Sequence, residues 1–152
     1  MQGDVSLRVE ERAETGRAFG NGQKRSIQLC SFLHQLSNGN KELYLTTQDA
    51  AEDADGFPEL LTAPLRGLLG EGLPLRPAVM GNMVPQALNL WMGCSGAGSS
   101  SGLHHDFHDN LYVLLRGRKR FRLYPPSAAS AMYTHGQVSK IHDNGRCGTG
   151  RI

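Results

Sequence analysis

The sequence has few of the features that mark membrane, secreted or zinc-binding proteins. No apolar run approaches the roughly 20 residues that a membrane-spanning helix requires, and the N-terminus lacks the apolar core of a secretory signal. The three cysteines, Cys30, Cys94 and Cys147, are an odd number without C-x-x-C spacing. This argues against a disulfide framework and a structural zinc site, and we expect a reducing compartment, cytoplasmic or nuclear.

An excess of charge of one sign is also missing. Sixteen Lys and Arg against 14 Asp and Glu leave a formal net charge of +2, which is too small to imply nucleic-acid binding. The hydrophobic fraction of 39% and the length of 152 residues are typical of one globular domain. We therefore expect neither nucleic acid nor a membrane as a direct partner, and the sequence indicates no oligomeric state.

The chain divides into three parts by composition. Residues 1–25 are polar and without a sustained period, so we expect this segment to be disordered. Residues 26–145 hold the patterned segments and form the expected domain. Residues 146–152 read as an irregular tail.

Four elements are expected before the glycine- and serine-rich run of residues 93–102. Apolar spacing, cap residues and turn residues predict them. They are a helix over 26–36 with Ser26 as its cap, a strand over 42–47, a helix over 58–69 with Pro58 in its first turn, and a strand over 86–92.

The clearest pattern in the chain is a hairpin. Residues 110–115 and 119–124 are two strand-like segments joined by a short turn that contains Gly117. In the second segment Lys119, Phe121 and Leu123 share one face, whereas the arginines at 118, 120 and 122 share the other. A helical turn is expected over 128–132, and residues 136–152 are poorly patterned.

His104 and Asp106 stand two residues apart just before this hairpin. Alternate residues of an extended segment point to the same side, so the imidazole and the carboxylate can converge on one metal ion. Such a pair is half of the 2-His-1-carboxylate triad that holds non-haem Fe(II). An H-x-D tripeptide alone is weak evidence for a metal site.

Lys119 strengthens this interpretation. A lysine that shares a face with large apolar residues is costly to bury unless an anion meets it. A dicarboxylate co-substrate could chelate the metal with one end and pair with the ammonium at the other. Asn110 begins the first strand of the hairpin and can face the same cavity.

These motifs carry a resemblance to a known family. The segment L-H-H-D-F-H-D-N-L-Y (103–112), followed by G-R-K (117–119) and L-Y-P-P (123–126), resembles the first half of the JmjC, or cupin-like, oxygenase core. In that family a small hydroxylic residue stands three positions before the histidine, and Ser101 occupies that place here. The resemblance is good over residues 86–126 and weaker over 26–85. It implies a mainly β fold with flanking helices, a partial double-stranded β-helix or jelly roll.

The resemblance also implies a site and a reaction. His104 and Asp106 would bind Fe(II), and Lys119 would hold the distal carboxylate of 2-oxoglutarate. Ser101 would assist by hydrogen bonding, and Asn110 would line the site. The family reaction converts 2-oxoglutarate to succinate and hydroxylates a C–H bond of the substrate, and demethylation is the same hydroxylation on an N-methyl group. We therefore expect a protein substrate.

The third metal ligand is not found by pattern. In the family it is a histidine on a late strand, but His135 and His142 follow the hairpin outside any strand pattern. His108 has the parity of Asp106, yet the family places no ligand there, and His105 has the opposite parity. We expect an incomplete domain that lacks the distal histidine.

Two functional classes remain open at this point. The leading hypothesis is a 2-oxoglutarate-dependent Fe(II) oxygenase, a protein hydroxylase of the small JmjC type or a histone or protein demethylase. The alternative is a non-catalytic cupin-like binding module, or an inactive fragment without the third iron ligand. A metal-dependent cupin that does not use 2-oxoglutarate is disfavoured, because Lys119 would then have no anionic partner.

Overall fold

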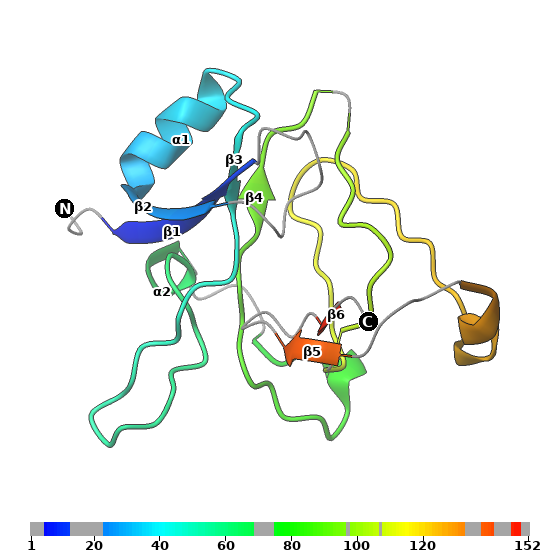
Figure 1. The fold of residues 1–152 in the computed structure, drawn as a ribbon. Coiled ribbons are helices and arrows are strands. Elements are labelled where there is room, and N and C mark those ends of the chain that lie inside the picture. Colours follow the sequence, from blue (N-terminus) through cyan, green and yellow to red (C-terminus); the bar gives the residue numbers. More distant parts are fainter. Residues whose placement is uncertain are drawn as a thin grey trace. The chain divides into compact units, whose positions relative to one another are not determined.

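The computed structural model describes residues 5–12, 23–68, 75–96, 98–106, 108–132, 138–141 and 147–149. The chain forms two compact units, Met1–Gly102 and Leu103–Ile152. The first unit holds a four-stranded antiparallel sheet, and the second holds a two-stranded antiparallel sheet (Figure 1). This mainly antiparallel β architecture with short helices agrees with the fold class expected from the sequence. In the described part of the chain, no helix is long and apolar enough to cross a membrane.

The first unit begins with a β-hairpin. Strands β1 (Ser6–Glu11) and β2 (Gln23–Gln28) pair antiparallel, with Leu7 opposite Ile27. The prediction of disorder over residues 1–25 is therefore wrong for residues 6–11 and 23–25. Leu7 and Val9 alternate with polar residues at the period of a half-buried strand, and the many charges around them obscured that short pattern.

Two further strands complete the sheet. Strand β3 (Leu43–Leu45) pairs with β1, and β4 (Met92–Gly93) pairs with β3, so the order is β2-β1-β3-β4. The strand predicted over 42–47 is confirmed in its central part. The strand predicted over 86–92 reaches the sheet only at its end, while Leu88 forms an isolated bridge with Leu61.

Helix α1 (Leu29–Ser37) follows β2 without a loop. The predicted helix exists, but Ser26 is not its cap, because Ser26 pairs with Arg8 in the β1–β2 ladder. The N-cap is Gln28, whose side chain makes no capping hydrogen bond. The helix ends at Asn38, and Gly39 follows with φ of +79°, a left-handed conformation that suits glycine.

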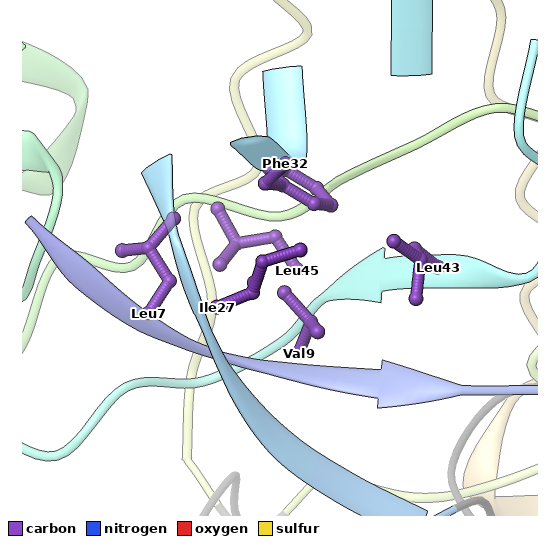
Figure 2. Packing of buried hydrophobic residues seen from close by; sticks show 6 residues of the cluster. All are labelled: Leu7, Val9, Ile27, Phe32, Leu43 and Leu45. Carbon is purple, nitrogen blue, oxygen red and sulfur yellow. The ribbon is translucent and has the colours of Figure 1, made fainter. Parts of the chain in front are cut away.

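The core of the first unit lies between the sheet and α1. It is made of residues that are at most 8% exposed and that come from three strands and the helix, and Figure 2 shows how they converge: Leu7, Val9, Ile27, Phe32, Leu43 and Leu45. Phe32 is the helix residue of the cluster, and it is completely buried. Burying one such side chain contributes about 1.5–3 kcal/mol, so this cluster is the main source of stability for the unit.

The helix predicted over 58–69 is mostly absent. Within residues 58–68 only α2 (Leu65–Leu68) is helical; before it, Pro58 and Leu61 lie in isolated bridges and residues 63–64 form a turn. Pro64 explains the difference, because a proline in the middle of a helix lacks the amide donor and clashes with the preceding turn. A single-turn 3-10 helix, Ala78–Met80, is the next element.

A buried polar network fixes the loops around the sheet. The Gln48 side chain accepts a hydrogen bond from the Arg8 amide (2.8 Å) and donates to the Arg8 carbonyl (2.8 Å). The Thr62 hydroxyl donates to the Leu88 carbonyl (2.9 Å) and also lies 3.0 Å from Asn89 Oδ1. The Gln48 bonds join segments that are 40 residues apart in sequence, and the Thr62 bonds join segments that are 26 and 27 residues apart.

The second unit contains a 3-10 helix, Pro126–Met132, and the antiparallel pair β5 (Val138–Ile141) and β6 (Cys147–Thr149). The helical turn predicted at 128–132 is thereby confirmed. Residues 147–149 are a strand, so the expectation of an irregular tail over 146–152 is wrong for those three. Because residues 136–152 show little pattern, the sequence did not predict strand β5 either.

The predicted hairpin over 110–124 does not form a β-ladder. Both segments lie outside regular secondary structure, and their side chains are exposed. The chain still reverses at Gly117, whose φ of +93° suits a tight turn. A two-stranded ladder without a covering layer is marginally stable, which is the physical reason that the alternating pattern alone does not produce strands here.

Candidate functional site

His104 and Asp106 lie together, as the H-x-D spacing predicted. His104 Nε2 is 3.6 Å from Asp106 Oδ1, and the two side chains are 27% and 37% exposed. A nitrogen and a carboxylate oxygen thus face one another from alternate positions of one segment. Solvent can reach both groups.

The amide of Asn110 holds the other oxygen of the same carboxylate. Asn110 Nδ2 donates to Asp106 Oδ2 (3.1 Å) and to the His108 carbonyl (3.1 Å). The Asp106 carboxylate therefore has one oxygen directed to His104 and the other fixed by Asn110. This arrangement limits rotation of the carboxylate, so that the oxygen facing the imidazole keeps its direction.

Lys119 lies against two aromatic rings. Its Nζ is 5.9 Å from the centroid of Tyr112 and 5.7 Å from that of Phe121, and these two rings meet edge to face at 5.1 Å. Contacts of this length between an ammonium and a ring face are weakly attractive. Within the described part of the chain, Lys119 forms no ion pair. The side chain is exposed, so solvent reaches the ammonium.

The remaining candidates are Ser101 and four histidines. Ser101 belongs to the first unit, where it is half-buried, whereas His104 belongs to the second. His105 and His108 are exposed. His135 and His142 lie outside the described residues. The assignment of Ser101 to the co-substrate stays a prediction, and the third metal ligand stays unassigned.

The donor set can be compared with the needs of a metal ion. Two ligand atoms in neighbouring positions of an octahedral ion lie about 3 Å apart when each bond is about 2.1 Å long. The 3.6 Å between His104 and Asp106 is within a small side-chain rotation of that distance. Among the described residues, no group of three or more His, Cys, Asp or Glu could hold a metal. The pair thus fits two positions of a mixed nitrogen and oxygen site.

Tyr112 is a site residue that the sequence reading did not single out. The alternation within residues 119–124 placed Lys119 with Phe121, but it did not extend across the turn. Pairing the two arms about residues 116 and 117 would have set Tyr112 opposite Phe121, as the ring contact shows. The register of the two arms about the turn was therefore the feature of the sequence that could have identified Tyr112.

Comparison with known proteins identifies the family. The model of the cupin-like domain matches residues 2–148, nearly the whole chain. A fission yeast protein (Schizosaccharomyces pombe), JmjC domain-containing protein 4, is 43% identical over 153 aligned positions. The chain belongs to the cupin-like, JmjC-type family. The resemblance carried by residues 86–126 is thereby confirmed, and with it the partial jelly-roll fold class.

Other relatives match over shorter segments. The human bifunctional peptidase and (3S)-lysyl hydroxylase JMJD7 is 40% identical over 55 residues, or 36% of this chain and 16% of that protein. The Arabidopsis thaliana lysine-specific demethylase JMJ32 is 39% identical over 49 residues, or 32% of this chain and 14% of that protein. The yeast match covers 94% of this chain, which spans about a third (32%) of that relative. No solved structure matches the chain significantly.

Proposed function

We propose that this cupin-like chain provides part of the site of a 2-oxoglutarate-dependent Fe(II) oxygenase, with His104 and Asp106 as two metal ligands. The observation that carries the proposal is the 3.6 Å approach of His104 Nε2 to Asp106 Oδ1 within a family-matched segment. Imidazole and carboxylate ligation is the type that non-haem Fe(II) oxygenases use. When bound, the iron would supply the oxidising chemistry for a C–H bond.

The other residues of the candidate site would bind the co-substrate or orient a metal ligand. Lys119, an exposed ammonium next to Tyr112 and Phe121, would pair with the distal carboxylate of 2-oxoglutarate. The two rings exclude water from one side of that ion pair, which strengthens it. Asn110 would keep the Asp106 carboxylate in place through the hydrogen bond to Oδ2. Ser101 would add a hydrogen bond to the co-substrate, as the family pattern implies.

The substrate class in this proposal is protein. The names of two relatives, a bifunctional peptidase and lysyl hydroxylase and a lysine-specific demethylase, both refer to lysine as the modified residue. We favour hydroxylation of the protein substrate. Demethylation is the second alternative, because it proceeds through the same hydroxylation of a C–H bond. A cytoplasmic or nuclear location, inferred from the cysteine pattern, belongs to the same proposal.

The test is succinate formation from 2-oxoglutarate in the presence of Fe(II) and ascorbate. The chain should form succinate, His104→Ala should abolish it, and His105→Ala, which removes the neighbouring imidazole, should retain it. Lys119→Ala should raise the KM for 2-oxoglutarate roughly 10- to 100-fold, because a hydrogen bond to a charged group contributes about 1.5–3 kcal/mol. Binding of 2-oxoglutarate without any succinate would instead support the non-catalytic module.

A further inference from the structure

The small net charge of the chain conceals a strong asymmetry. Residues 1–102, the first unit, carry 8 Lys and Arg against 11 Asp and Glu. Residues 103–152, the second unit, carry 8 Lys and Arg against 3 Asp and Glu. The formal net charges are therefore −3 and +5. Averaging over the whole chain hides a basic unit that could attract an anionic partner.

The positive charge of the second unit is concentrated in one turn. Five of the seven residues from Arg116 to Arg122 are basic, and all five are exposed. No acidic residue occurs between Asn110 and Met132. Within the described part of the chain none of the five forms an ion pair. Among the described residues, no acidic side chain is paired with this cluster.

The cluster has two sides. Lys119 lies on the side of the Tyr112 and Phe121 rings, where its ammonium contacts both. Because successive side chains of an extended segment alternate, the arginines before and after Lys119 are directed to the other side. We call the three residues Arg118, Arg120 and Arg122 the arginine row. The row is thus separate from the lysine assigned to the co-substrate.

From this arrangement we infer that the arginine row is a docking surface for an extended acidic polypeptide segment, and that this segment belongs to the protein substrate. The inference rests on the proposed function. Alternate residues of an extended chain are about 6.6–6.8 Å apart, so carboxylates at every second position of a parallel or antiparallel peptide match the row one to one. Each guanidinium can bind a carboxylate through two hydrogen bonds.

The exposed main chain favours a polypeptide over a nucleic acid. Among the described residues, the amides and carbonyls of residues 111–124 form no backbone–backbone hydrogen bond. An extended peptide would satisfy these groups and the guanidinium groups together. A nucleic-acid strand has no regular row of amides and carbonyls to pair with this main chain. Exposed apolar residues such as Leu111 and Val113 also offer contacts for the alternate side chains of a peptide.

The test uses fluorescence anisotropy with a labelled nine-residue peptide of alternating Glu and Thr. The chain should bind it, and Arg118→Gln, Arg120→Gln and Arg122→Gln combined should weaken binding at least about tenfold. The matched control removes three exposed positive charges from the first unit, by Lys24→Gln, Lys41→Gln and Arg76→Gln, and should retain binding. A peptide with Gln in place of Glu should bind weakly.

Three results would overturn the inference. The first is a loss of peptide binding in the control variant as large as in the row variant. The second is binding of the Gln peptide as tight as that of the Glu peptide. The third is tighter binding of an oligothymidine of similar charge, which would indicate a nucleic-acid surface. Replacing the row by Glu and offering a Lys-Thr peptide guards against a folding defect, since recovered binding requires a folded chain. The row variants should keep the wild-type KM for 2-oxoglutarate, so a failed docking surface and a failed oxygenase are distinguishable.

Discussion

At the scale of single residues, the Asp106 carboxylate is the centre of the candidate site. Its Oδ1 faces His104 at 3.6 Å, and its Oδ2 accepts a hydrogen bond from Asn110 at 3.1 Å. The family resemblance assigned Asn110 to the lining of the co-substrate site, whereas the hydrogen bond gives it a contact with a metal ligand. Groups that orient metal ligands typically contribute 10- to 100-fold to metal affinity.

This contact yields a prediction about Asn110. Asn110→Ala should weaken Mn(II) binding by about tenfold even without 2-oxoglutarate, because the carboxylate loses the group that orients it. Calorimetric titration of Mn(II) measures the effect. Asn40→Ala, which removes the amide that donates to Gln35 in the first unit, is the control and should bind Mn(II) normally. A change in 2-oxoglutarate affinity alone would mean that Asn110 only lines the co-substrate site.

At the scale of elements, helix α1 and the strands β1, β2 and β3 stabilise the first unit through one apolar cluster. The sequence placed α1 and β3 nearly correctly because both show a clear period and are bounded by turn residues. It missed β1 and β2, whose few apolar residues lie among charged ones, so only pairing with a neighbour reveals them.

A neighbouring pair of helix residues tests that account of the core. Phe32 is completely buried, whereas Leu33 beside it is 42% exposed. Phe32→Ala should lower the free energy of unfolding by about 3–5 kcal/mol, because it leaves a cavity in the cluster. Leu33→Ala should cost less than about 1 kcal/mol. Urea denaturation followed by circular dichroism compares the two, and similar losses would mean that the core is elsewhere.

The site was predictable from the sequence only where local spacing determines it. The H-x-D motif brings His104 and Asp106 together within one segment, so their approach needed no tertiary information. The contact of Lys119 with Tyr112 depends on the register of a turn, which alternation along one arm does not define. The predicted ladder at 110–124 depends on covering partners, and no local pattern supplies those.

At the scale of the whole molecule, one chain combines an acidic unit with its own core and a basic unit with the candidate ligands. The chain spans about a third of its fission yeast relative, so the activity of the longer protein is a proposal here. The charge difference between the units means that ionic strength should act mainly on the second, where the five basic residues from Arg116 to Arg122 are exposed.

The central claim is that His104 and Asp106 bind one metal ion, and Mn(II) binding tests it most directly. The six-line electron paramagnetic resonance signal of free Mn(II) decreases as the ion binds, so a titration in the presence of 2-oxoglutarate gives the affinity. We predict measurable binding that falls at least about tenfold in His104→Ala and in Asp106→Ala but is kept in His105→Ala. Absence of binding, or an equal loss in His105→Ala, would contradict the claim.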